Sequence, residues 1–168
     1  LEDTDGCMRY AGAVISGLKV GPSPDWLVQR LQSVGSRSIN NVVDATNYML
    51  LGFGQPMHAF DLQQIAHGTV VVRKTRGEEL IKTLDGIDRT LPPGAVVIGD
   101  AERAQGIAGI IGGSGSEVSN TTTQIFLEVA AFNPARIRAT RRKLGISTDA
   151  SDRFELGVDA DGIPGLVD

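Results

Sequence analysis

The chain has 168 residues, of which 41% are hydrophobic and 21 are glycine, and its formal net charge is -4. This length and composition are typical of one globular domain with many tight turns and strands, and the acidic balance argues against a general polyanion binder. A single cysteine, Cys7, excludes an internal disulfide framework, and with only two histidines at unrelated positions we expect no metal site. No run approaches the roughly 18 apolar residues of a membrane span and no signal peptide opens the chain, so we expect a cytoplasmic protein without membrane contact.

The first predicted elements are a strand and a helix. Residues 10–20 are apolar, β-branched and spaced by glycine, which predicts a strand. Ser23 is then predicted to cap a helix that has Pro24 at its first position and ends at Gly35.

The next segment mixes polar and apolar side chains in a way that indicates the wall of a site. Residues 38–52 predict a helix with Gly52 as its end. Three polar residues stand among its apolar side chains: Asp44, Thr46 and Asn47. A buried polar group without a partner costs about 1–3 kcal/mol, so these residues serve either a structural network or a ligand. After a Gly-Phe-Gly turn, Pro56 forces an extended path that presents His58.

Short apolar runs in the middle of the chain predict strands at 69–73, 80–84, 96–99, 107–111 and 125–129. The Asp-Gly pair at 85–86 signals a tight hairpin. The Asn-Pro pair at 133–134 opens a helix that Gly145 closes, and Thr148 can cap a shorter helix that ends near Gly157. Strands in the middle with helices towards both ends indicate an α+β fold.

Two features of the second half are candidates for a site. The glycine-rich stretch 106–116 lacks the Gly-Lys-Ser/Thr ending of a phosphate loop, so its small residues indicate strand packing or close backbone approach, for instance of a flat substrate against Gly109. Glu128 is a lone carboxylate in an apolar run, where an unpaired charge is costly. Either the alternation of a strand turns Glu128 to solvent, or a partner or ligand meets it.

Four stretches in one order resemble the editing region of the bacterial phenylalanyl-tRNA synthetase beta subunit. They are INNVVDATNYMLLGFGQPMHAFD at 39–61, TLDGIDRTL at 83–91, IAGIIGG at 107–113, and the run from Leu127 to Asp159. Residues 7–31 also match, so the resemblance covers nearly the whole chain. It implies that residues 1–168 form a single editing domain with a β-sandwich-like core flanked by helices, two intertwined lobes being an open alternative. Because the chain opens on Leu1, we also expect it to come from the interior of a longer polypeptide, with 160–168 as a linker to further domains.

The resemblance implies an aminoacyl-tRNA ester hydrolase. Its substrate would be the 3′ end of phenylalanine-specific tRNA wrongly charged with tyrosine, and its partners the remaining beta-subunit domains and the alpha subunit of a heterotetramer. The hydrolysis needs no cofactor, whereas ATP and Mg belong only to the synthetic reaction of the parent ligase, which we do not expect from this piece. The alternative is a non-catalytic module that holds the beta subunit together or docks tRNA.

The resemblance assigns seven residues to the pocket: His58 and Thr148 as catalytic, and Glu128, Asn47, Thr46, Gly109 and Ala150 as substrate-binding. Glu128 would accept a hydrogen bond from the phenol of tyrosine. His58 would orient or deprotonate water, or anchor the terminal ribose, and a structural loop histidine is the plain alternative. Thr148 would orient water or substrate or simply cap a helix, and Ala150 would keep the entrance narrow.

The other pocket assignments and a basic helix complete the predicted site. Asn47 and Thr46 would line the same pocket, with Asn47 suited to the amino group or the ribose of the substrate. Five cations crowd one predicted helix and either contact tRNA phosphates or form a solvated face: Arg136, Arg138, Arg141, Arg142 and Lys143. The chain departs from the family where Leu156 and Ala160 replace an arginine and a proline, which puts in doubt the packing against a following module.

Overall fold

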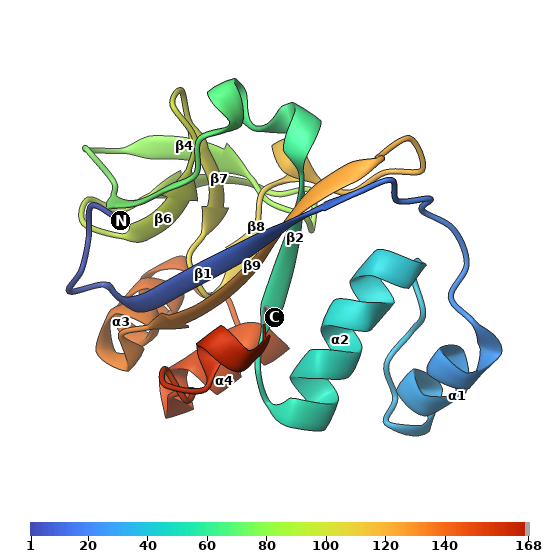
Figure 1. Ribbon diagram of the computed structural model, residues 1–168. Coiled ribbons are helices and arrows are strands. Elements are labelled where there is room, and N and C mark those ends of the chain that lie inside the picture. Colours follow the sequence, from blue (N-terminus) through green and yellow to red (C-terminus); the bar gives the residue numbers. More distant parts are fainter. Residues whose placement is uncertain (167–168) are drawn as a thin grey trace.

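The computed structural model describes residues 1–166 (Figure 1). Its helices are α1 (Asp25–Ser33), α2 (Asn41–Phe53), α3 (Pro134–Leu144) and α4 (Asp149–Leu156). Its strands are β1 (Cys7–Ser16), β2 (Met57–Asp61), β3 (Val71–Lys74), β4 (Glu79–Lys82), β5 (Asp88–Leu91), β6 (Val96–Gly99), β7 (Ala104–Ile107), β8 (Ile111–Gly112) and β9 (Gln124–Phe132). The predicted α+β class is confirmed. None of the helices formed by residues 1–166 is long and apolar enough to cross a membrane.

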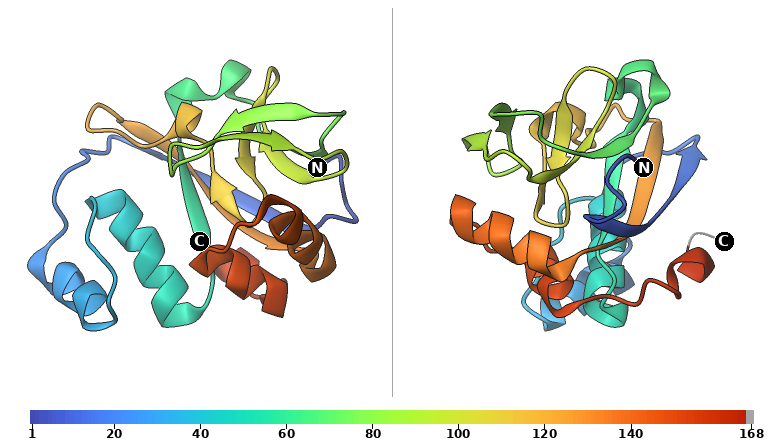
Figure 2. Two further views of the ribbon diagram at one scale, coloured as in Figure 1. Left: turned by 180° about the vertical axis from the view of Figure 1, so that it is seen from behind. Right: turned by 90° about the vertical axis from the view of Figure 1, so that its left-hand side faces the viewer.

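The strands form three antiparallel sheets. In the three-stranded sheet, the long strand β9 lies between β1 and β2. A four-stranded sheet has the order β3-β6-β7-β8, and β4 pairs with β5 in a hairpin that a bridge between Thr83 and Gly113 ties to the end of β8. In Figure 1 the four-stranded sheet lies above β1 and β9 and the helices lie below them, and the two views of Figure 2 show the same arrangement.

The two faces of the three-stranded sheet bury different neighbours. Successive side chains of a strand point to opposite faces, so Phe60 and Phe132 face the four-stranded sheet and share a core with Ile98 and Ile107. Ala59 and Ile125 point the other way and pack with Val42 of α2. The sheet therefore separates the β-rich half of the molecule from α1 and α2.

The two C-terminal helices begin and end where the sequence predicts. The Asn133 side chain accepts a hydrogen bond from the Ala135 amide, and Gly145 ends α3 in a left-handed conformation with φ 64°. Thr148 caps α4, which ends before Gly157. The Asp-Gly pair at 85–86 forms the turn between β4 and β5, as predicted, with the Gly86 amide donating to the Thr83 carbonyl at 2.8 Å.

The predicted boundaries of the first two helices are wrong by one to three residues, α2 beginning at Asn41 and not at residue 38. Pro24, which has no side-chain donor or acceptor, occupies the cap position of α1, and the hydroxyl of Ser23 instead donates to the buried carboxylate of Asp44 at 2.5 Å. The helix α2 continues past Gly52 because Gly54, at φ 74°, is the residue that adopts the left-handed conformation and ends it.

Several predicted strands also differ, and β9 runs over Gln124–Phe132, not 125–129. The first strand runs over Cys7–Ser16, not 10–20, because Gly17 turns the chain out of the sheet at φ 74°. The run 107–111 is not one strand, because Gly109 at φ 65° forms the turn between β7 and β8.

The C-terminal segment packs on the domain. Ile163 is fully buried against Val129 and Ala131 of β9. Leu156 is 82% exposed at the end of α4, so its side chain lies outside the core. That 160–168 leads to further domains stays a prediction, and residues 167–168 lie outside the described part of the chain.

Candidate functional site

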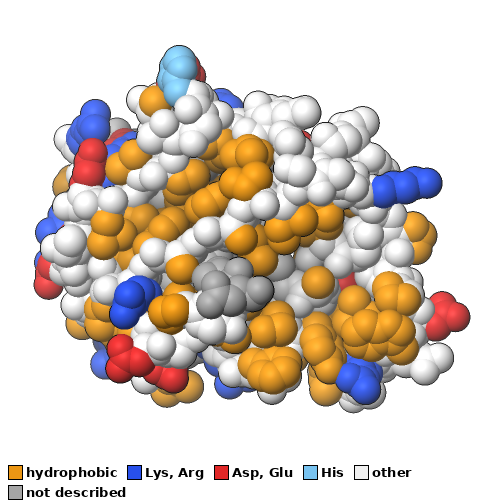
Figure 3. All heavy atoms as spheres, viewed as in Figure 1, with side chains coloured by type: hydrophobic (Ala, Val, Ile, Leu, Met, Phe, Trp, Pro, Cys, Tyr) orange, Lys and Arg blue, Asp and Glu red, His pale blue; other side chains and the backbone are white. Residues whose placement is uncertain are grey.

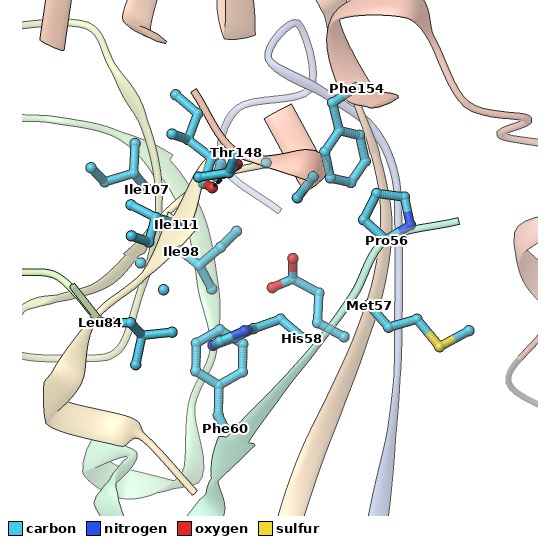
Figure 4. A pocket seen from close by; sticks show the side chains of 17 residues that line it. Pro56, Met57, His58, Phe60, Leu84, Ile98, Ile107, Ile111, Thr148 and Phe154 are labelled. Carbon is cyan, nitrogen blue, oxygen red and sulfur yellow. Dashed lines mark hydrogen bonds between the residues drawn. The ribbon is translucent and has the colours of Figure 1, made fainter. Parts of the chain in front are cut away.

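A cavity of about 230 Å³ lies between the three-stranded sheet, the β7–β8 turn and α4 (Figure 4). Most of its wall is apolar, with Phe60 on β2, Ile107 and Ile111 beside the turn, and Phe154 on α4. Three side chains with polar groups line it: His58, Glu128 and Thr148. In Figure 4 His58 and Phe60 lie side by side on β2, while Thr148 and Phe154 come from the opposite wall. The cavity is thus an apolar pocket with a few polar groups placed at defined points, which is the usual form of a small-molecule site.

Glu128 lies in the middle of the central strand β9, with 7% of its surface exposed. Its Oε2 accepts a hydrogen bond of 2.8 Å from the hydroxyl of Tyr10 on β1. Burial raises the pKa of the Glu128 carboxyl to about 7, although the Tyr10 hydrogen bond acts in the opposite direction. A solvent-facing Glu128, the plain alternative drawn from strand alternation, is therefore ruled out.

His58 lies on β2 and is the cross-strand neighbour of Glu128 on β9. Its ring meets Phe60 edge-on, with ring centroids 4.4 Å apart. Its Nε2 is buried and has no hydrogen-bond partner in residues 1–166. Burial lowers the pKa of the imidazole to about 4, so the ring is neutral at pH 7. A neutral imidazole with an unpartnered nitrogen has one hydrogen-bonding position that the described residues leave unused.

The backbone of Gly112 lies against the His58 ring. A Cβ added to Gly112 would stand 2.5 Å from Cε1 and 2.7 Å from Nε2 of His58, which real Cβ contacts do not reach. Only glycine at position 112 leaves room for the His58 ring where it lines the cavity.

Thr148 and Gly109 line the cavity and also make contacts that hold the fold together. The Thr148 hydroxyl donates to the Ile110 carbonyl at 2.7 Å and accepts from the Ser151 amide at 3.1 Å, so the predicted helix cap is present and also fastens α4 to the β7–β8 turn. The hydroxyl proton of Thr148 is therefore already used, and only one lone pair of its oxygen is left to accept a hydrogen bond. Gly109 lines the cavity, and a Cβ there would stand 2.9 Å from three core side chains. Ala150 lines the cavity on α4, beside Phe154.

Asn47 and Thr46 are not among the residues that line this cavity. Thr46 lines a separate apolar groove with Leu127, whose side chain lies on the opposite face of the sheet from Glu128. Asn47 belongs to α2, which packs beside β2, and its side chain forms no hydrogen bond within the described residues. Their roles in substrate binding stay predictions.

Three of the five cations on α3 are neutralised by neighbours. Arg136 pairs with Asp5 at 2.6 Å, Arg138 with Glu155 at 2.6 Å, and Arg141 bridges Asp152 and Glu155 at 2.7 Å. Arg142 and Lys143 are exposed and form no ion pair within residues 1–166. Lys and Arg side chains are scattered over the face shown in Figure 3, where apolar side chains gather over α1 and α2. Arg142 and Lys143 are therefore the two cations of this helix that no carboxylate of the described residues pairs with.

Sequence reasoning missed Tyr10 and Gly112. A hydroxyl in an otherwise apolar strand was the available signal for Tyr10, but its partner depends on the pairing register of β1 with β9. Within residues 1–166, no group of three or more His, Cys, Asp or Glu side chains is placed to hold a metal ion.

Comparison with known proteins gives one consistent result. The sequence pattern of the B3/4 domain family matches residues 6–166. The chain is 52% identical over 163 residues to the phenylalanine–tRNA ligase beta subunit of Carboxydothermus hydrogenoformans, which covers 97% of this chain and 20% of that protein. The corresponding subunit of Syntrophotalea carbinolica is 48% identical over 168 residues, which covers 100% of this chain and 21% of that protein. The chain thus spans about a fifth of the length of these relatives.

A solved structure agrees at the level of the fold. An N-terminal fragment of the phenylalanyl-tRNA synthetase beta subunit from Pyrococcus horikoshii superposes with a TM-score of 0.57 at 15% identity, covering 84% of this chain and 46% of that chain. Since the family pattern covers almost the entire chain, this protein belongs to the B3/4 domain family, in the form carried by phenylalanine–tRNA ligase beta subunits.

Proposed function

We propose that the cavity is an editing site, which hydrolyses tyrosine wrongly esterified to phenylalanine-specific tRNA. The observation that carries the proposal is that His58 and Glu128, which are cross-strand neighbours, line the same apolar cavity of about 230 Å³. That volume is below the roughly 300–1,000 Å³ of sites for drug-sized ligands, and suits one aromatic side chain with its ester. The ring would lie between Phe60 and Phe154, against the glycine-bearing turn.

Glu128 would supply the selectivity. An apolar pocket that binds phenylalanine rejects tyrosine only about 10²-fold, because the added hydroxyl alone costs little. A buried carboxylate gives the opposite preference: it accepts a hydrogen bond from the tyrosine phenol, and phenylalanine leaves it buried without that partner. Sites that hydrogen-bond a substrate hydroxyl reject the analogue without it by about 10⁴–10⁵-fold. The same enzyme would thereby spare its correct product.

The chemistry requires water and placement more than a nucleophile. The oxygen of a bound water attacks the ester carbonyl, the bond to the tRNA ribose oxygen breaks, and the products are free tyrosine and tRNA with its 3′-terminal hydroxyl restored. His58, neutral and with a free Nε2, would hold that water or the ribose. Cys7 is unsuited to covalent catalysis, because burial raises the pKa of its thiol to about 12 and it does not line the cavity.

The relatives support a proposal for the setting. The substrate would be a charged tRNA end, and the partners the other beta-subunit domains and an alpha subunit in the cytoplasm. ATP and Mg would serve only the ligation carried out by the whole enzyme. No step proposed for this cavity involves either of them.

Deacylation assays test the proposal. Tyrosyl-tRNA and phenylalanyl-tRNA, each on phenylalanine-specific tRNA, are incubated with the intact synthetase and with its Glu128→Ala and His58→Ala variants. We expect rapid hydrolysis of the tyrosyl ester alone, loss of that preference in Glu128→Ala, and loss of rate in His58→Ala. Absence of hydrolysis by the wild-type enzyme would leave the non-catalytic module as the function.

A further inference from the structure

We infer that Tyr10 is a positioning residue for specificity: its hydroxyl holds one oxygen of the Glu128 carboxylate so that the other oxygen faces the tyrosine phenol in the cavity. This inference rests on the proposed function. Tyr10 itself does not line the cavity and would not touch the substrate.

The first support is the geometry of the hydrogen bond. Tyr10 and Glu128 lie on neighbouring strands, and the Tyr10 hydroxyl reaches Oε2 at 2.8 Å. Glu128 forms no second side-chain hydrogen bond within residues 1–166. A carboxylate has about four acceptor positions, so fixing Oε2 still leaves Oε1 free for a ligand.

The second support is that packing against neighbouring residues fixes the position of the Tyr10 ring. Its ring stacks on Phe126, with centroids 6.3 Å apart and planes inclined by 19°. Gly12, the residue paired with Glu128 across β1 and β9, makes this possible, since a Cβ there would stand 2.1 Å from the Phe126 ring. A phenol held by stacking keeps its hydroxyl in one direction, as a recognition site requires.

The third support concerns ionisation. Burial, together with the neighbouring Glu128 charge, raises the pKa of Tyr10 well above its usual range, so this residue stays a donor at every working pH. The hydrogen bond that it donates lowers the pKa of Glu128 against the effect of burial. The other groups that face Glu128 are His58 on β2, which is neutral at pH 7, Cys7 on β1, whose thiol is protonated, and Thr148 on α4. No cation is among them, so Tyr10 is the group that favours the ionised acceptor.

The test compares Tyr10→Phe with Tyr48→Phe in the intact synthetase. Tyr48 is the other tyrosine of the chain, and its hydroxyl accepts from Arg30 on the far side of α2, away from the cavity. Hydrolysis of tyrosyl-tRNA and phenylalanyl-tRNA is measured from pH 5.5 to 8.5, with the uncatalysed rate subtracted. In the wild type we expect the preference for the tyrosyl ester to rise with pH through about 7, as Glu128 ionises.

In Tyr10→Phe we expect the midpoint to move up by about one pH unit, because the loss of a hydrogen bond to a charged group shifts a pKa by about this much or more. The preference at pH 7 should then fall about fivefold and recover at high pH. Tyr48→Phe should follow the wild type. An unchanged midpoint in Tyr10→Phe, or a loss of rate on both esters alike, would overturn the positioning role while leaving the editing function intact. If the wild type hydrolyses neither ester, the editing function fails, and the positioning role is overturned with it.

Discussion

Replacing Glu128 by glutamine tests whether the carboxyl is as deeply buried as the structure shows. Glutamine keeps the shape of the side chain but cannot ionise. The carboxyl holds its proton more tightly in the folded chain than in the unfolded one, so its contribution to stability is complete below pH 4.5 and is lost as the pH rises through about 7. The glutamine variant lacks that loss.

The magnitude follows from the two pKa values. A rise from 4.5 in the unfolded chain to about 7 in the folded one lowers the free energy of unfolding by about 3 kcal/mol across this range, since one pKa unit corresponds to about 1.4 kcal/mol. His58 acts in the opposite sense. Its pKa falls from 6.5 to about 4 on folding, so it favours the folded state increasingly as the pH rises between these values. Because His58 is present in both proteins, its effect cancels in their difference.

Urea unfolding of the wild-type chain and of Glu128→Gln, at pH values from 4.5 to 8, measures that difference. We expect the variant to gain about 3 kcal/mol relative to the wild type over this range. The exposed Glu78→Gln should track the wild type throughout, because that side chain is in water in both states. A difference between Glu128→Gln and wild type that does not change with pH would refute the reasoning.

Three further predictions concern the turn beside the cavity and the basic helix. Gly112→Ala, whose new methyl would stand 2.5 Å from the His58 ring, should slow deacylation of tyrosyl-tRNA at least about tenfold by displacing the imidazole. The control Gly115→Ala, whose nearest contact is at 3.5 Å, should leave the rate unchanged. Equal deacylation rates in the two variants would contradict the role of Gly112. Gly109→Ala combines φ 65° with three core contacts at 2.9 Å and should lower the free energy of unfolding, measured in urea, by about 2–4 kcal/mol. The control Gly145→Ala, whose Cβ meets open space, should lower it by about 1–2 kcal/mol. Similar losses in the two variants would show that the core adjusts freely around Gly109. In tRNA binding at several salt concentrations, Arg142→Ala should flatten the salt dependence by about one unit and the ion-paired Arg138→Ala should change it less, whereas the reverse order would place the contact elsewhere.

Features set by near neighbours in the chain could be predicted from the sequence. The α3 helix illustrates this, because Asn133 and Gly145 satisfy its ends through bonds to residues a few positions away. The Asp-Gly turn before β5 is another case. Where two candidates stood close together, as with Gly52 and Gly54, local pattern did not decide which one adopts the left-handed conformation.

The site required information that only the fold contains. His58 and Glu128 could each be singled out as polar groups in apolar surroundings, but their pairing depends on the register of β2 with β9. Thr46 lines a different hollow from His58 and Glu128, and the sequence does not show which face of the sheet α2 covers. Tyr10 was missed because its hydroxyl bonds to Glu128, which lies 118 positions away in the sequence.

A crystal structure with a non-hydrolysable tyrosyl-adenosine, in which an amide replaces the ester, tests the central claim most directly. We expect the tyrosine ring in the cavity between Phe60 and Phe154, its phenolic oxygen within hydrogen-bond distance of Glu128, and the amide close to His58. A ring bound outside this cavity, or a phenylalanyl analogue bound in it with equal affinity, would contradict selection by Glu128.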